Sequence, residues 1–273
     1  MAARDPHRFV NELDEPAVEG LIARLETRAK EAVFARLLDQ YAARLALPAG
    51  ARVLEVGCGT GTTVRALVRR ADFDGTAVGV DHSPAFIVAA RRFAQDEGVG
   101  ARLEFHVGDA HDLGFAEESF DAVIAHTLIS HVADPAVVLG EMVRVARRDA
   151  TVVIFDGDYA SLTYAHPDVA LGQQMDAALA VAAFNNPRIM RDLPRLLPGL
   201  GLAMTAAWGD TVAEIGRASY FRSFAQTYLP YVRQAGLVAA ARADAWLAYQ
   251  RDAMDNGTFF ASCNYYTYLV RRL

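Results

Sequence analysis

The sequence of 273 residues has few of the features that mark secreted, zinc-binding or membrane-spanning proteins. It contains only two cysteines, Cys58 and Cys263, and no CxxC pair, which argues against a disulfide framework or a structural zinc site. No stretch approaches about 18 uncharged apolar residues, so we expect no membrane span. Residues 1–15 are polar and lack the apolar core of a signal peptide, and we therefore expect a cytoplasmic protein.

An excess of basic residues is also missing. Lys and Arg number 27 against 33 Asp and Glu, which gives a net charge of −6. Proteins that bind nucleic acid normally present a basic face, so nucleic acid is not an expected partner. Apolar residues, in contrast, make up 53% of the chain, and the length suits one large α/β domain with a sizeable core.

Strand-like and helix-like patterns alternate between residues 51 and 156. Buried strands are predicted at 51–56, 76–81, 102–107, 120–125 and 151–156, with helices at 60–70, 84–97 and 134–147. Continuous apolar strands joined by crossover helices predict a parallel sheet that is covered on both faces. The predicted fold class is therefore α/β, with a doubly wound sheet.

The flanking segments complete a single predicted domain over residues 1–273. Residues 1–47 are predicted to form a helical arm, read as helix over 16–46, and residues 48–156 the alternating core. Residues 157–198 and 217–255 are predicted as helical insertions that form a cap, and 201–212 and 258–270 as the last two strands. The oligomeric state stays open, although the arm offers two copies a way to form a homo-oligomer.

A glycine-rich loop follows the first strand in the order Glu55-Val56-Gly57-Cys58-Gly59-Thr60-Gly61. Ligands of open parallel sheets bind outside the carboxyl ends of the strands, where glycines allow close approach and helix N-termini offer free amides. The spacing is G-x-G-x-G rather than the G-x-G-x-x-G of dinucleotide-binding loops. Glu55 would repel a pyrophosphate but attract an ammonium or a sulfonium group.

Two further carboxylates follow the next two strands. Asp81 ends the second strand and can accept hydrogen bonds from both hydroxyls of a ribose. Asp109 follows the third strand and can accept from an adenine amino group, although a simple turn would also place an aspartate there. Carboxylates at the ends of three adjacent strands fit a positively charged adenosine compound.

The segments VLEVGCGTG, GVDHSP, VGDA and SFDAVIAHTLISHV resemble the class I S-adenosylmethionine methyltransferases, especially the group related to ubiquinone and menaquinone biosynthesis. The resemblance covers about residues 48–156 and implies a seven-stranded, mostly parallel sheet with the last strand antiparallel. It also implies S-adenosylmethionine as the cofactor and S-adenosylhomocysteine as its product. One departure is Ala146-Arg147-Arg148-Asp149-Ala150, where the family usually has Lys/Arg-Pro-Gly-Gly, and it concerns a turn far from the site.

The resemblance and the strand-end positions together select a set of candidate cofactor-binding residues. Arg28 is added because the helical arm can fold over the site and bring a guanidinium to the methionine carboxylate. The full set is Arg28, Glu55, Gly57, Cys58, Gly59, Gly61, Asp81, His82, Phe86, Asp109, Ala110, His126 and Thr127.

Candidates for acting on the substrate are weaker in the sequence. His131 is a candidate general base, although it can equally pack or orient the fourth loop. Tyr159, with Asp156 and Asp158, can reach the substrate, or the stretch can be a turn with capping acids. Five of the seven histidines lie between residues 82 and 131, but no metal-ligand spacing accompanies them, so no metal is predicted.

The predicted reaction is in-line methyl transfer from S-adenosylmethionine to a small, partly apolar acceptor held under the helical insertions. The positive sulfur already activates the methyl group, so the main task of the enzyme is proximity and alignment. Carbon, oxygen and nitrogen acceptors all remain open. Two alternatives are a non-catalytic S-adenosylmethionine-binding protein and a nucleotide-dependent oxidoreductase, which the position of the third glycine disfavours.

Overall fold

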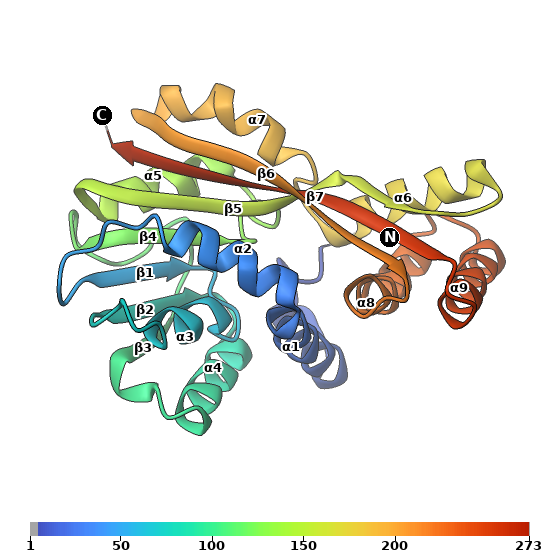
Figure 1. Ribbon diagram of the computed structural model, residues 1–273, viewed down its shortest axis with the longest axis horizontal. Helices are drawn as coiled ribbons and strands as arrows, with labels where there is room; N and C mark the ends of the chain where they lie inside the picture. The colour runs from blue at the N-terminus through green and yellow to red at the C-terminus, as the bar shows by residue number, and fades with distance from the viewer. Residues whose placement is uncertain (1–4, 273) are drawn as a thin grey trace.

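The computed structural model describes residues 5–272 of the chain. Seven strands form one sheet in the order β3-β2-β1-β4-β5-β7-β6 (Figure 1). All neighbours pair in parallel except β7, which is antiparallel to both β5 and β6. The strands are β1 (Arg52–Val56), β2 (Thr76–Asp81), β3 (Leu103–Val107), β4 (Phe120–His126), β5 (Ala146–Tyr164), β6 (Leu202–Gly216) and β7 (Phe259–Arg272). The predicted doubly wound, seven-stranded, mostly parallel sheet is confirmed.

Helices cover both faces of this sheet, because the side chains of its strands alternate between two apolar clusters. On β1, Val53 joins one cluster, whereas Leu54 and Val56 join the other. The first cluster packs against α3 (Thr62–Val68) and α4 (Pro84–Asp96). The second packs against α5 (Pro135–Val145) and α7 (Ile189–Leu196). Burial on both faces explains why these strands are apolar throughout.

The N-terminal arm is not the continuous helix that the sequence predicted over 16–46. It divides into α1 (Glu15–Lys30) and α2 (Ala32–Ala42), because Glu31 has an extended backbone and its carboxylate accepts a hydrogen bond from the Ser219 hydroxyl at 2.5 Å. Because of this break, the two helices pack against different parts of the molecule. α2 packs on the sheet, whereas α1 lies beside α8 (Tyr220–Gln234) (Figure 1).

Strand β5 is much longer than predicted. The sequence ended it at residue 156 and assigned 157–164 to a helical insertion, but the strand continues to Tyr164. Beyond β4 it keeps pairing with β7, with a register shift between Asp158 and Thr163. Pairing with a distant strand therefore overrides a local composition that favours a turn. Residues 159–162 of β5 therefore stand opposite a single residue of β7, Cys263, and interrupt the regular pairing.

The cap stands on the far halves of β5, β6 and β7, which extend beyond the shorter strands (Figure 1). It consists of α6 (Val169–Ala183), α8 and α9 (Ala240–Asp255). The predicted helical insertion 157–198 contains the end of β5, then α6, α7 and part of a 3₁₀ turn, and the last strands run on to Gly216 and Arg272. The 3₁₀ turns are Val10–Glu12, Gly100–Arg102 and Leu197–Leu200. None of the helices in residues 5–272 has the length and apolarity needed to cross a membrane.

Candidate functional site

One cavity of about 310 Å³ lies at the carboxyl ends of β1, β2 and β4, between the sheet, α1 and the cap. Most of the residues singled out from the sequence line it. They are Arg28, Glu55, Gly57, Cys58, Gly59, Asp81, His82, Phe86, Asp109, Ala110, His126, Thr127, His131 and Tyr159. Gly61, Asp156 and Asp158 do not belong to its wall.

Gly61 serves packing rather than the cavity, contrary to its predicted place beside the cofactor. It begins α3 with a φ of +74°, and a Cβ atom there would lie 2.6 Å from the Phe105 ring. Gly57, with a φ of +67°, does face the cavity, and a Cβ atom would meet the Leu128 side chain. The three glycines therefore have two different roles.

Asp81 holds the turn between the first two strand ends. Its Oδ2 accepts from the Gly59 amide at 2.8 Å and its Oδ1 from the Ser83 amide at 2.9 Å. Burial raises the pKa of Asp81, and the two amides and His82 oppose that shift. A carboxylate has about four lone-pair sites, so acceptor capacity remains on the side that faces the cavity.

Glu55 is deeply buried, and this changes its predicted electrostatic role. Its Oε2 accepts from the Val64 amide at 3.2 Å at the start of α3. Burial raises the pKa of Glu55 to about 8, although Thr63, Val64 and Arg28 pull it down. At neutral pH the free protein therefore holds most of this carboxyl in the neutral form. A cationic ligand would have to lower the pKa of Glu55 on binding before this carboxyl carries the negative charge that the sequence predicted.

Asp109 shapes a turn and also lines the cavity. Its Oδ1 accepts from the amide and from Nδ1 of His111, at 2.9 and 2.7 Å, so it does shape a turn. The same side chain lines the cavity at the end of β3. Cys58 is buried in the glycine loop after β1, and burial raises the pKa of its thiol well above the usual value, as expected for an unreactive cysteine.

Arg28 of α1 reaches the end of β4, as predicted for a group near the methionine end of a cofactor. Its Nη1 donates to Thr127 Oγ1 at 2.8 Å, and Thr127 itself has a φ of +56°. The neighbouring His126 is held by the Tyr41 hydroxyl at 2.9 Å, and burial lowers its pKa well below the usual value. Tyr41 belongs to the arm, and nothing local in the sequence pointed to this contact.

The opposite end of the cavity is an aromatic chamber that the sequence did not specify. Its wall combines Arg24 of α1 with Tyr220 and Tyr228 of α8 and with Phe184, which follows α6. Tyr159 completes it, with its ring stacked on Phe184 at a centroid distance of 3.3 Å. Burial raises the pKa of the Tyr159 phenol well above its usual value, so the phenol stays protonated and does not serve as a base.

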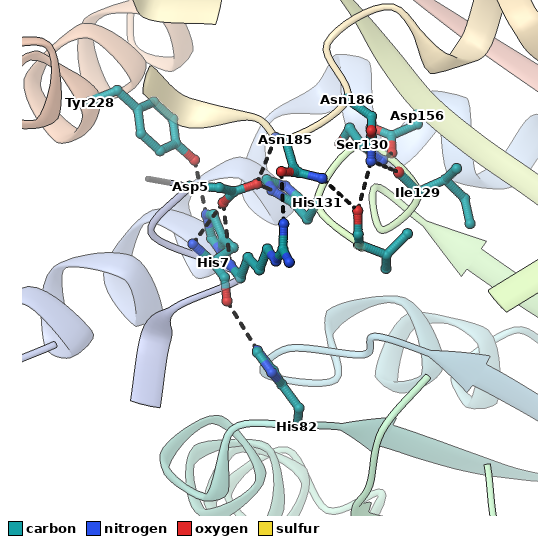
Figure 2. A network of polar contacts seen from close by, with 12 residues as sticks. Asp5, His7, His82, Ile129, Ser130, His131, Asp156, Asn185, Asn186 and Tyr228 are labelled. Carbon is teal, nitrogen blue, oxygen red and sulfur yellow. Dashed lines mark hydrogen bonds and ion pairs between the residues drawn. The ribbon is translucent and has the colours of Figure 1, made fainter. Parts of the chain in front are cut away.

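His131 is anchored by a residue far away in sequence. Its Nδ1 lies 2.7 Å from Asp5 Oδ2, and Asp5 also accepts from the amides of His7, Arg8 and Asn185 (Figure 2). Burial alone would lower the pKa of His131, but Asp5 outweighs it and the net shift is upward. No pattern in residues 1–15 pointed to this role of Asp5, because His131 and Asn185 lie more than a hundred residues away in the sequence.

Asp156 and Asp158, predicted as possible substrate contacts, instead support the chamber from outside. Asp156 accepts from the amides of Ser130 and Gly157, which fixes the loop after β4 (Figure 2). Asp158 forms an ion pair with Arg191 of α7 at 2.6 Å. Within residues 5–272, no group of three or more His, Cys, Asp or Glu side chains is arranged to hold a metal ion.

Known proteins match this chain most clearly over its core. A family profile described as a methyltransferase domain matches residues 54–154. The chain is 40% identical to a ubiquinone biosynthesis O-methyltransferase of Azorhizobium caulinodans over 97 residues. This matched stretch makes up 34% of this chain and 36% of that protein. Residues 54–154 therefore match a methyltransferase domain, in line with the resemblance of this core to the class I S-adenosylmethionine methyltransferases.

The methyltransferase domain has relatives that extend beyond the core. An uncharacterized 37.1 kDa protein in transposon TN4556 of Streptomyces fradiae is 29% identical over 228 residues, which is 81% of this chain and 63% of that protein. Ajmaline N-methyltransferase of Rauvolfia serpentina is 32% identical over 45% of this chain and 39% of its own length. The chain thus spans less than two thirds of the length of these curated relatives.

Solved structures share the fold at low sequence identity. Geranyl diphosphate C-methyltransferase from Streptomyces coelicolor A3(2), solved with Mg²⁺, geranyl diphosphate and S-adenosyl-L-homocysteine, has a TM-score of 0.55 and 18% identity over 89% of this chain and 79% of that one. The [4+2]-cyclase SpnF has a TM-score of 0.58 and 20% identity over 87% of this chain and 81% of that one. These likenesses support the fold, and they do not select a reaction.

Proposed function

We propose that the protein transfers a methyl group from S-adenosylmethionine to a small, partly apolar molecule. The observation that carries this proposal is a single cavity with two chemically different ends. One end is lined by the glycine loop, Asp81 and Asp109, and the other by the aromatic chamber. Donor and acceptor would then lie in one enclosed space, which is the arrangement that in-line transfer requires.

The donor is proposed to lie along the ends of β1, β2 and β3. Asp81 would accept from the ribose hydroxyls, Asp109 would approach the adenine, and Arg28 would pair with the methionine carboxylate. Glu55 would face the positive end of the donor from beneath the loop. Support for this assignment comes from the position of all four side chains on one cavity wall, and from the family that residues 54–154 match.

The acceptor is proposed to lie in the chamber, where its nucleophilic atom attacks the methyl carbon. As the new bond forms, the bond from carbon to sulfur breaks and its electron pair stays on sulfur, which leaves neutral S-adenosylhomocysteine. The aromatic wall formed by Tyr159, Phe184 and Tyr228 would exclude water from this step. We assign Tyr159 to that wall, because a buried phenol with a raised pKa stays protonated and cannot accept a proton from the acceptor.

His131 is proposed as the base for an acceptor that must lose a proton. Its ring lines the cavity, and Asp5 fixes its orientation through Nδ1. Among residues 5–272 no hydrogen-bond partner of Nε2 is found, so this nitrogen is available to a substrate. Because Asp5 raises the pKa of His131, the unprotonated form gains population as the pH rises above the usual histidine range.

Two measurements test the proposal. Calorimetry should detect binding of S-adenosylhomocysteine and no binding of NAD; the reverse result would favour an oxidoreductase. Incubation with S-adenosylmethionine labelled in the methyl group and a metabolite extract should then give a labelled small molecule. Tight binding of S-adenosylhomocysteine without any labelled product would contradict the transferase and leave a non-catalytic binding protein.

A further inference from the structure

Arg24, in the middle of α1, brings a positive charge into the aromatic chamber. Its side chain lines the cavity although the residue is only 7% exposed. Its contacts are with neutral groups. The guanidinium donates to the Ser223 hydroxyl at 3.3 Å and to Tyr228, and it lies 5.0 to 5.2 Å from the ring centroids of Tyr220, Phe224 and Tyr228.

A buried guanidinium normally has an anionic partner, because removing its charge from water is costly. Arg65 is the internal reference: it is equally buried, and Glu26 and Glu97 both pair with it. For Arg24, no carboxylate between residues 5 and 272 lies within ion-pair distance. Cation–π contacts offset part of the cost, but they leave most of the five N–H donors of the fork unused.

The acids closest to the cavity are already engaged or lie at its other end. Asp5, which contacts His131 of the cavity wall, accepts from that ring and from three backbone amides. The three carboxylates of the cavity wall, Glu55, Asp81 and Asp109, belong to the strand ends near the glycine loop. The protein thus leaves a positive charge uncompensated inside the chamber.

The lowered pKa of His7 reflects burial and the same excess of positive charge. Its Nε2 lies 2.9 Å from the Tyr228 hydroxyl, on the wall of the chamber (Figure 2). Burial lowers the pKa of His7 well below the usual value, and the positive charges of His131, Arg24 and Arg28 lower it further. A negative group in the chamber would face these cations without meeting an opposing carboxylate.

Arg24 and Arg28 serve opposite ends of the cavity. They are four residues apart, so both lie on one face of α1, separated by about one helical turn. Arg28 points to Thr127 at the end of β4, whereas Arg24 points to α8. If the donor carboxylate belongs to Arg28, Arg24 remains for a second anion.

Resting on the function proposed above, we propose that the methyl acceptor is an apolar or aromatic carboxylate whose carboxylate group binds to Arg24. A planar guanidinium offers two parallel N–H donors that match the two oxygens of a carboxylate. The stacked rings of Tyr159 and Phe184 would contact the apolar body of the acceptor. The carboxylate is then an anchor, and a second group of the acceptor receives the methyl group.

The test uses protein saturated with S-adenosylhomocysteine and three probe pairs: benzoate with benzamide, phenylacetate with phenylacetamide, and cinnamate with cinnamamide. Calorimetric titration should show at least one carboxylate binding about tenfold or more tightly than its amide. In Arg24→Gln the ratio should fall below about twofold, and Arg24→Lys should keep an intermediate ratio. Arg36→Gln, an exposed arginine of α2 paired with Asp210, is the matched control and should keep the full ratio.

The outcomes separate this inference from the proposed function. Carboxylates that bind no better than amides, or no carboxylate binding at all, would overturn the inference while S-adenosylhomocysteine binding stays intact. Failure of the wild-type protein to bind S-adenosylhomocysteine would instead overturn the donor assignment. Melting curves and S-adenosylhomocysteine affinity verify that Arg24→Gln is folded; if it is not, Arg24→Lys and the wild-type ratio decide the question.

Discussion

The two ends of the cavity are built in different ways. The donor end consists of backbone turns and carboxylates that follow consecutive strands, so that most of its residues fall between Glu55 and Thr127. The chamber end takes single residues from the N-terminal segment, α1, β5, the loop after α6, and α8. The donor end carries negative charge and open backbone, whereas the chamber carries aromatic rings and positive charge.

This difference indicates which end of the cavity is common to related proteins and which end is specific to this one. The strand-end loops of the donor end lie within residues 54–154, the stretch that matches a methyltransferase domain, and they follow from local strand-end geometry. The acceptor differs from one relative to another, and residues brought together from distant segments can change independently. Substitutions at the two ends should therefore have separable effects on donor binding and on acceptor chemistry.

The largest expected effect tests the chamber alone. His131→Gln should lower kcat by about 10²- to 10⁴-fold, the usual contribution of a general base, while changing S-adenosylhomocysteine affinity by less than about twofold. Steady-state kinetics with the identified acceptor and calorimetry measure the two quantities. The control is His106→Gln, an exposed histidine of β3 outside the cavity. An unchanged kcat would show that His131 is not the general base and has a structural role instead.

The pH profile sharpens the same test. Because Asp5 raises the pKa of His131, and a base acts in its unprotonated form, kcat should increase as the pH rises through a value above 6.5. Asp5→Asn removes the negative charge, so the rising limb should move to lower pH. A profile that keeps its position in Asp5→Asn would show that another group titrates.

The next effect tests the donor end alone. Asp81→Ala should weaken S-adenosylhomocysteine binding by about 30- to 1000-fold, since it removes charge-assisted hydrogen bonds worth about 2–4 kcal/mol in total. Calorimetry measures the dissociation constant. Asp96→Ala, at the exposed end of α4, should leave it unchanged. An affinity within twofold of wild type in Asp81→Ala would contradict the ribose assignment.

A smaller effect tests whether α1 divides its two arginines between the two ends. Arg28→Gln should weaken S-adenosylhomocysteine binding by about tenfold, through the loss of one ion pair with the methionine carboxylate. Arg24→Gln should change the same affinity by less than about twofold. If calorimetry showed that Arg24→Gln weakens S-adenosylhomocysteine binding more than Arg28→Gln does, the two arginines would have the opposite roles. That result would contradict the proposed division.

The smallest effect concerns the proton on Glu55. With a pKa of about 8, this carboxyl is mostly protonated at pH 7, and a cationic donor should lower that pKa. Binding of S-adenosylmethionine at pH 7 should then release a fraction of a proton, detected by calorimetry in buffers of different ionisation enthalpy. Glu55→Gln should abolish the release, whereas release that persists would have another source.

The same shift has a consequence for stability. A raised pKa in the folded state means that the contribution of Glu55 is fully present below the unfolded value near 4.5 and is lost as the pH rises through about 8. Wild-type protein should therefore lose more stability over this range than Glu55→Gln does. Denaturant unfolding at several pH values measures the difference, and parallel curves would contradict the shift.

The donor end was predictable because it depends on neighbours in the chain. Glu55, Gly57 and Asp81 follow strands that apolar patterns reveal, and parallel strands bring their ends together at one edge. Gly61 was misplaced, since spacing cannot distinguish a glycine that faces a ligand from one that faces Phe105. The neutral state of Glu55 also required the folded structure, because burial sets it.

The chamber was largely beyond prediction for a physical reason. Asp5, Arg24 and Tyr228 meet only after the arm folds over the sheet, and no spacing in the sequence records that contact. The extension of β5 was missed because residues 157–164 resemble a turn, while the hydrogen bonds that extend the strand come from β7. Tyr159, predicted as a residue that acts on the substrate, lines the cavity, and its buried surroundings favour packing over proton transfer.

The length of β5, β6 and β7 has a mechanical consequence. Each of these three strands continues from the core into the cap, with a register shift in β5 between Asp158 and Thr163, so the two regions share one sheet. We therefore expect core and cap to unfold in one cooperative transition. A ligand that touches only one end of the cavity should then raise the melting temperature of the whole molecule.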